Sequence, residues 1–408
     1  MFERRHWIPP GGLLFAQACH GLSWLLLLWI ALTAGVAELS MPALTWIHLV
    51  ALGWFTVAAL SVLLFAIPQM ADQPWRYEGA TRTALGWFAA GVAFFVLALF
   101  VATRFVGLAA AFVYVTLLVY LLAAWTTLAQ RRQADRAERA IARAFFITLL
   151  VLGIVATLGL ILALSLSGID LGVLSSQLPA AHGNLGFFGW LSLLVYGVST
   201  RTVRPSTGSK PSRLTHIVVG TATLAGALAL AAGLGVDNPI ATWTGAVLIG
   251  LGAVVYCVDM ASVIARATVP HRPPQAFIAA AITWLLVALA FGASALAGYK
   301  TALAFGFVIL VGWIGQMVNA HIFHIGTRVI ATVYRGEDDE TQPEELLDQR
   351  LEWAAFACFQ GAIILVALGL WLGYAPPVAI GAIAGGAGWL AMIANLNLAR
   401  SRALPHVG

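Results

Sequence analysis

Twelve apolar stretches, each longer than 20 residues and separated by polar breaks, constrain the fold of this 408-residue chain more than any other feature. A bilayer core is about 30 Å thick, so an α-helix needs roughly 20 apolar residues to cross it. The stretches therefore predict an all-α polytopic membrane protein with one integral membrane domain over residues 1–408. The expected transmembrane helices cover 12 to 35, 43 to 67, 83 to 103, 105 to 129, 141 to 168, 177 to 200, 214 to 234, 240 to 264, 275 to 297, 301 to 327, 351 to 372 and 376 to 399.

Positive charges are distributed unevenly between the two ends of these helices. Twenty Lys and Arg residues fall on the side of the N-terminus, and two, Arg104 and Lys300, fall on the other side. Because Lys and Arg concentrate in cytoplasmic loops, both termini are expected on the cytoplasmic side of a bacterial-type inner membrane. With 61% hydrophobic and 10% charged residues, the composition excludes a soluble enzyme or a nucleic-acid-binding protein and implies a lipid environment.

Gly-Trp pairs suggest an internal repeat. They occur at Gly53, Gly189 and Gly312, in the second, sixth and tenth expected helices, so that three units of four helices would fit. The same dipeptide also begins at Gly86 and Gly388, outside this pattern, so the repeat stays one of two interpretations.

Histidines are the main polar groups inside the expected helices. Carboxylates are nearly absent there, which argues against a proton-coupled transporter or an ion pump. Neutral imidazole binds haem iron and metal ions, and helix bundles build such sites from facing side chains. Haem b, one or two per chain, suits a bundle rich in Gly, Phe and Trp, with copper as a further candidate. The candidate ligands are His20, His48, His182, His216, His321 and His324.

Depth in the membrane divides these histidines into two groups. His48 and His182 are expected near the outer boundary, as a haem or metal site, whereas His321, His324 and His20 are expected near the inner one. At 1.5 Å rise per residue the groups lie roughly 15 to 25 Å apart, too far to share one iron. His216 is either a metal ligand or a solvated residue at a helix start. Any of the other histidines could instead form only a hydrogen bond to a neighbouring helix. The expected hydrogen-bonding partners of the inner group are Gln17, Gln316, Asn319, Gln360, Asn395 and Asn397.

Twelve helices with histidines on the second, sixth and tenth resemble the catalytic subunit of haem-copper oxidases and nitric oxide reductases. The segments 48–54 (HLVALGW) and 182–190 (HGNLGFFGW) are also similar to the NnrS family, haem- and copper-containing membrane proteins linked to nitric oxide stress. The oxidase resemblance implies that His48 binds a low-spin haem, His182 binds copper, and the pair at 321 and 324 binds both haems. This sequence lacks the His-His pair of the seventh helix, so oxygen reduction of the oxidase type is not expected.

Three functions remain open at this point. The first is a haem b protein that transfers electrons, or binds nitric oxide or oxygen, with a quinone, a cytochrome or the gas as its partner. If it is an enzyme, it is a haem-dependent oxidoreductase. The second is a transporter or chaperone that uses the histidines as transient ligands for a metal or haem. The third is an assembly partner of a respiratory complex, in which the histidines only join helices. The visible absorption spectrum separates the three.

Overall fold

The computed structural model describes residues 10–129, 136–169, 171–172, 176–207, 213–267, 273–336 and 343–404. Within these residues, eleven helices are long and apolar enough to cross a membrane. The chain is therefore an all-α polytopic membrane protein. The segment expected at 177–200 is helical but is not among the eleven. Helix α8 continues past residue 200 to Thr207 and carries Arg201 and Arg204 beyond the expected stretch.

The chain divides into two compact units. Unit 1 comprises Met1–Cys19 and Ile47–Asp259, and unit 2 comprises His20–Trp46 and Met260–Gly408. Helices α1 (Pro10–Trp29), α2 (Met41–His48) and α10 (Pro239–Ala265) each contribute residues to both. The other elements of unit 1 are η3 (Leu49–Thr56), α3 (Val57–Ala71), α4 (Glu78–Val101), η4 (Thr103–Phe105), α5 (Val106–Ala129), α6 (Arg136–Leu166), α7 (Leu178–Asn184), η5 (Leu185–Ser192), α8 (Leu193–Thr207) and α9 (Arg213–Gly235). Those of unit 2 are η2 (Ile30–Ala34), α11 (Pro273–Leu296), α12 (Ala302–Phe307), η6 (Val308–Gly315), α13 (Gln316–His321), η7 (Ile322–Gly326), α14 (Thr327–Arg335), α15 (Pro343–Leu346), α16 (Gln349–Leu372) and α17 (Ala375–Ala403).

Several helices extend further into polar sequence than the apolar stretches indicate. The tenth expected helix ends at Arg335 instead of residue 327, and the fifth begins at Arg136 instead of residue 141. The start of α4, expected at 83, lies at Glu78, which forms an i, i+4 ion pair with Arg82 at 3.0 Å. Hydropathy marks only the part of a helix that fits the bilayer, whereas Arg and Glu are good helix formers that continue the helix into water.

Three of the helices contain an eight-residue π-helix, and each π-helix contains one of the three repeated Gly-Trp pairs. Gly53 lies in η3, Gly189 in η5 and Gly312 in η6, each at the fifth position of its segment. The Gly-Trp pairs at Gly86 and Gly388 lie in ordinary α-helix. Because π-helix accounts for well under 1% of residues in proteins, three such segments at corresponding positions are not a coincidence of sequence.

Close packing explains the glycine in each π-helix. A methyl group on Gly53 would lie 2.8 Å from Cys19 Sγ, and one on Gly189 would lie 2.8 Å from Val151 Cγ1. One on Gly312 would lie 2.9 Å from the Cβ atom of Trp284. A methyl group on Gly86 would meet nothing within 4 Å. Each of the three π-helices therefore packs so closely against a neighbouring helix that no residue larger than glycine fits at this position.

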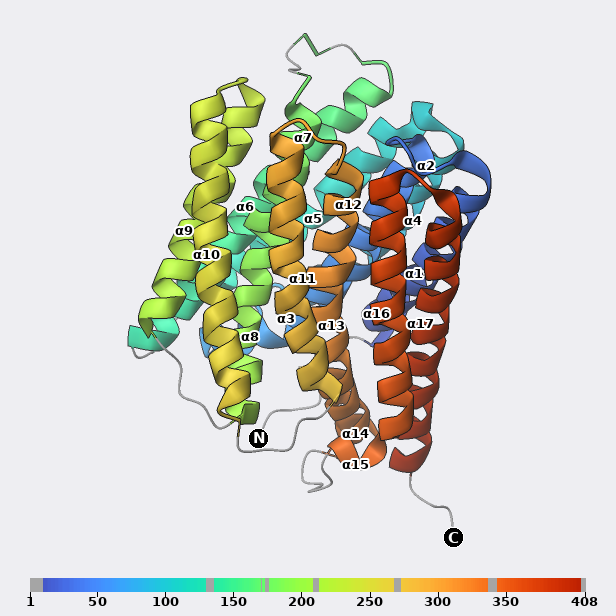
Figure 1. Cartoon of the computed structure of the whole chain (residues 1–408). Coiled ribbons are helices and arrows are strands. Elements are labelled where there is room, and N and C mark those ends of the chain that lie inside the picture. The colour runs from blue at the N-terminus through green and yellow to red at the C-terminus, as the bar shows by residue number, and fades with distance from the viewer. Residues whose placement is uncertain are drawn as a thin grey trace. The chain divides into compact units, whose positions relative to one another are not determined.

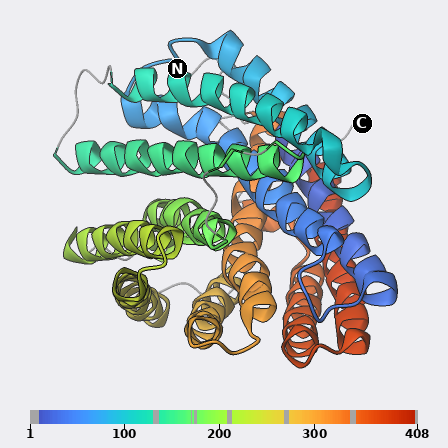
Figure 2. The same ribbon diagram turned by 90° about the horizontal axis from the view of Figure 1, so that it is seen from above.

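Small residues also bring regular helices together within each unit. In unit 2, α16 and α17 lie side by side in both views of the chain (Figures 1 and 2). A methyl group on Gly381 of α17 would lie 3.0 Å from the Ala362 carbonyl oxygen of α16. In unit 1, Gly226 of α9 faces α10 equally closely, with the Gly245 carbonyl oxygen 2.8 Å from where its Cβ would be. Such small-residue contacts are typical of helix pairs packed within a membrane.

Candidate haem or metal site

The structure brings His48 and His182 together in unit 1. Their ring centroids lie 6.4 Å apart, and the ring planes are inclined by only 16°. His48 is the last residue of α2, directly before η3, and His182 lies in α7, three residues before η5. Each histidine therefore lies just before the N-terminal end of a π-helix.

A hydrogen bond between the two π-helices fixes their relative position. The Trp190 Nε1–H group of η5 donates to Thr56 Oγ1 of η3 at 3.2 Å. Thr56 in turn donates to the Ala51 carbonyl oxygen, five residues back, at 2.8 Å. The two imidazoles are thus carried by segments that are joined to each other near their C-terminal ends, which holds the histidine-bearing ends in register.

Helix α6 orients the His182 ring. His182 Nδ1 lies 3.1 Å from the Val155 carbonyl oxygen. A carbonyl oxygen only accepts, so Nδ1 carries the proton and the lone pair resides on Nε2. Gly159, one turn further along α6, leaves room for the ring, because a methyl group there would lie 3.0 Å from His182 Cε1. A backbone carbonyl bound to one ring nitrogen is the usual support of a histidine that binds a metal through the other.

An aromatic side chain confines the second imidazole. The Phe95 ring of α4 meets His48 edge-on, with centroids 5.3 Å apart and planes inclined by 70°. Both histidines are partly buried rather than fully enclosed. The pair therefore lies among apolar side chains but is not sealed into the core.

The separation of the two imidazoles matches that of two ligands on one metal. Nitrogen-to-metal bonds of about 2 Å and aromatic bonds of roughly 1.3 Å place the centres of two imidazoles on one ion about 6 Å apart. Rings in direct stacking contact have centroids from about 4.5 to 7 Å apart, so 6.4 Å is near the wide end of that range. No group of three or more His, Cys, Asp or Glu side chains gathers at a metal-binding distance within the described residues. Two imidazoles could hold a haem iron, whereas a bare metal site usually needs three or four protein ligands.

Two other candidate ligands have described side chains. His20 and His321 belong to unit 2. His20 is fully buried, with its ring parallel to that of Phe359 at 5.6 Å, and His321 Nδ1 lies 2.7 Å from the Met317 carbonyl oxygen. The side chains of His216 in α9 and His324 in η7 lie outside the described residues.

The expected amide partners of the inner histidines have different roles. Asn395 bonds through both amide atoms to the backbone of Asp348, at 2.7 and 3.0 Å, and so anchors the start of α16 to α17. Asn397 is exposed. Gln360 donates to Gln316 at 2.7 Å in the core of unit 2. These contacts make Asn395 a structural residue rather than the ligand partner that the sequence suggested.

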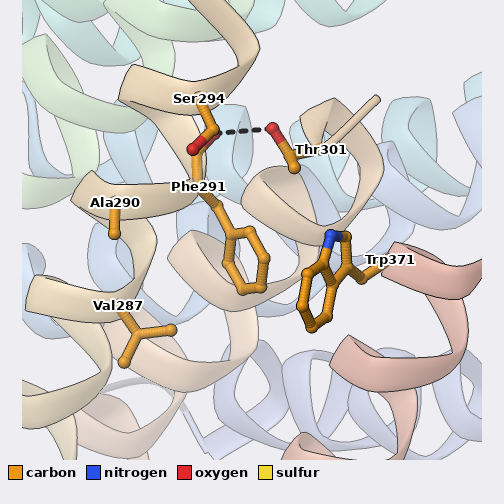
Figure 3. Close-up of a pocket in the computed structure, with 6 residues that line it drawn as sticks. All are labelled: Val287, Ala290, Phe291, Ser294, Thr301 and Trp371. Carbon is orange, nitrogen blue, oxygen red and sulfur yellow. Dashed lines mark hydrogen bonds between the residues drawn. The ribbon is translucent and has the colours of Figure 1, made fainter. Parts of the chain in front are cut away.

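An aromatic groove between α11 and α16 was not anticipated from the sequence. Phe291 and Trp371 lie beside each other in it, with ring centroids 6.1 Å apart, and Thr301 donates to the Phe291 carbonyl oxygen at 2.9 Å (Figure 3). Its volume is about 180 Å³, and no histidine is among its described lining residues. Pockets for drug-sized ligands occupy about 300 to 1,000 Å³, so the groove is too small for a macrocycle.

Comparison with known proteins adds no family to this description. The sequence matches no family model, and no curated protein is significantly similar to it. The function is therefore inferred from the residues themselves.

Proposed function

We propose that this chain is a haem b-binding membrane protein in which His48 and His182 would together hold one haem. The observation that carries the proposal is the pair of nearly parallel imidazoles 6.4 Å apart, one of them oriented by a backbone carbonyl. The resemblance of segments 48–54 and 182–190 to haem-binding membrane proteins supports the same assignment.

The protein residues around the pair would orient it and exclude water. Val155 fixes the tautomer of His182, Gly159 admits its ring, and Phe95 confines His48. Haem, when bound, supplies one-electron chemistry and a site for diatomic gases. With two histidines to hold the haem, the chain would transfer electrons with a quinone or a cytochrome, or bind nitric oxide or oxygen.

The repeat and the topology complete the proposal. Twelve transmembrane helices in three units of four, with both termini cytoplasmic, agree with the three matched π-helices and with the distribution of Lys and Arg. We place the protein in a bacterial-type inner membrane. The groups around His321 and His20 are candidates for a second haem or for copper in unit 2.

The visible spectrum of the purified full chain tests this proposal. The reduced protein is expected to show the Soret and alpha bands of haem b. His48→Ala and His182→Ala should each remove or shift these bands, while Gly153→Ala, whose methyl group would make only an ordinary contact of 3.6 Å with Leu121, is the control that should leave them unchanged.

Each other result has a definite meaning. Identical spectra in the native protein and in both variants contradict the assignment of ligands. A labile metal without a Soret band supports the metal transporter or chaperone instead, and a colourless protein with its histidines intact supports the assembly partner.

A further inference from the structure

A chain of hydrogen bonds in the core of unit 2 has a fixed direction. Trp284 Nε1–H donates to Gln360 Oε1 at 2.9 Å, and Gln360 Nε2 donates to Gln316 Oε1 at 2.7 Å. An indole nitrogen only donates, so neither amide can be turned around without placing two donors opposite each other. The chain therefore ends with the NH2 group of Gln316 directed away from Gln360.

The next polar groups along α13 lack partners. Gln316 is fully buried and Asn319 is 1% exposed. Among the residues that the structure describes, neither Gln316 Nε2 nor either amide atom of Asn319 has a hydrogen-bond partner. Residues three apart lie on neighbouring parts of one helix face. Because buried polar groups are almost always bonded to protein or to ordered water, this part of the core requires a polar occupant.

The available donors and acceptors define that occupant. Gln316 presents N–H groups, which repel a cation and require an acceptor. No Lys or Arg is buried anywhere in the described residues, so an anion would have no counter-charge. Asn319 offers both donors and an acceptor, which suits a small neutral molecule that can do both. We propose that Gln316 and Asn319 bind internal water in the core of unit 2.

The helix that carries Gln316 and Asn319 is flanked by π-helices, which agrees with a binding site for water. α13 has only six residues and lies between two π-helices, η6 before it and η7 after it. Short π-helical segments inside α-helices occur frequently at functional sites. The water site lies in unit 2 and does not depend on a haem between His48 and His182.

Radiolytic labelling of the full chain in oxygen-18 water tests the proposal. X-rays convert bound water into hydroxyl radicals, which oxidise side chains close to it, and methionine is highly reactive. Met317 directly follows Gln316 in α13 and is 1% exposed, so radicals from bulk water do not reach it. We expect Met317 to incorporate oxygen-18 at least severalfold faster than Met392, a fully buried control in the same unit.

Two substitutions link the label to the amide. Asn319→Leu should lower the labelling of Met317 severalfold, whereas Asn319→Ser, which keeps a polar group and adds space, should retain it. Thermal unfolding of both variants shows that each remains folded. Equal labelling of Met317 and Met392 in the native protein would overturn the proposal, and so would labelling of Met317 that Asn319→Leu leaves unchanged.

Discussion

Replacing Gly159 by Ala should disturb the histidine pair without touching either histidine. The new methyl group would lie 3.0 Å from His182 Cε1. Carbon atoms in contact prefer about 3.5 to 4.0 Å, so one of the two must move by at least half an ångström. The methyl group is fixed on α6, and the ring is held by its hydrogen bond to Val155 on the same helix. The ring therefore has to rotate and weaken that bond.

The change in the free energy of unfolding follows from two destabilising contributions and one stabilising contribution. Overpacking of this kind costs about 1 to 3 kcal/mol. The weakened hydrogen bond removes about 0.5 to 1.5 kcal/mol more. Ala favours a helix over Gly by about 0.8 to 1.0 kcal/mol, which offsets part of the loss. A net loss of stability of about 0.5 to 3.7 kcal/mol is expected, together with a change in the geometry of the pair.

Gly153→Ala is the matched control. Gly153 lies in the same helix, and a methyl group there would lie 3.6 Å from Leu121, an ordinary contact. This variant gains the helix propensity without the clash, so it should be as stable as the native protein or more so. The assay is the haem content per chain, the position of the alpha band and the midpoint potential, measured beside thermal unfolding. If Gly159→Ala matches Gly153→Ala in all of these, the arrangement around His182 inferred here is wrong.

Three other measurements check separate parts of the description. Reporters fused after Asp237 should read external, and reporters fused at the C-terminus should read cytoplasmic; a cytoplasmic signal at Asp237 would refute the topology. Gly312→Ala should lower the unfolding temperature, because its methyl group would lie 2.9 Å from Trp284 Cβ, whereas Gly86→Ala, with open space, should raise it or leave it unchanged. Haem quantification should give two haems per chain, one of them lost on joint substitution of His321 and His324, if unit 2 holds a second cofactor; a single haem that survives this substitution would exclude it.

The apolar stretches predicted the membrane-spanning parts of the chain well because length and hydropathy alone decide whether a helix can cross a bilayer. They did not predict where helices end in water. There the free energy depends on helix propensity and on local ion pairs such as that of Glu78 with Arg82, which hydropathy does not measure.

The histidine pair was predictable in part. Their positions five and seven residues before a Gly-Trp pair indicated that His48 and His182 belong together, and the structure places their rings 6.4 Å apart. The groups that orient His182 gave no signal. Val155 acts through its backbone carbonyl, which every residue has, and Gly159 is one of 40 glycines in the chain.

The π-helices could not be read from hydrophobic periodicity, because their segments are apolar on every side. They also limit any depth estimated from an α-helical rise of 1.5 Å per residue, since that value applies only to the α-helical turns. The estimated gap between the outer and inner histidines crosses η6 and therefore carries this error.

The residues that precede the Gly-Trp pairs differ between the two units. Relative to the glycine of its Gly-Trp pair, His48 lies five residues earlier and His182 seven. The corresponding residues before Gly312 are Phe307 and Phe305. Phe307 packs against Trp46 at 5.7 Å, and Phe305 lies 3.1 Å from where a methyl group on Gly292 would be, so both are used for helix packing in unit 2. The same wide helical turn thus occurs before or at three Gly-Trp pairs, preceded by histidines in two of them and by phenylalanines in the third. A cofactor in unit 2 therefore has to use ligands beyond its π-helix, such as His321, rather than residues equivalent to His48 and His182.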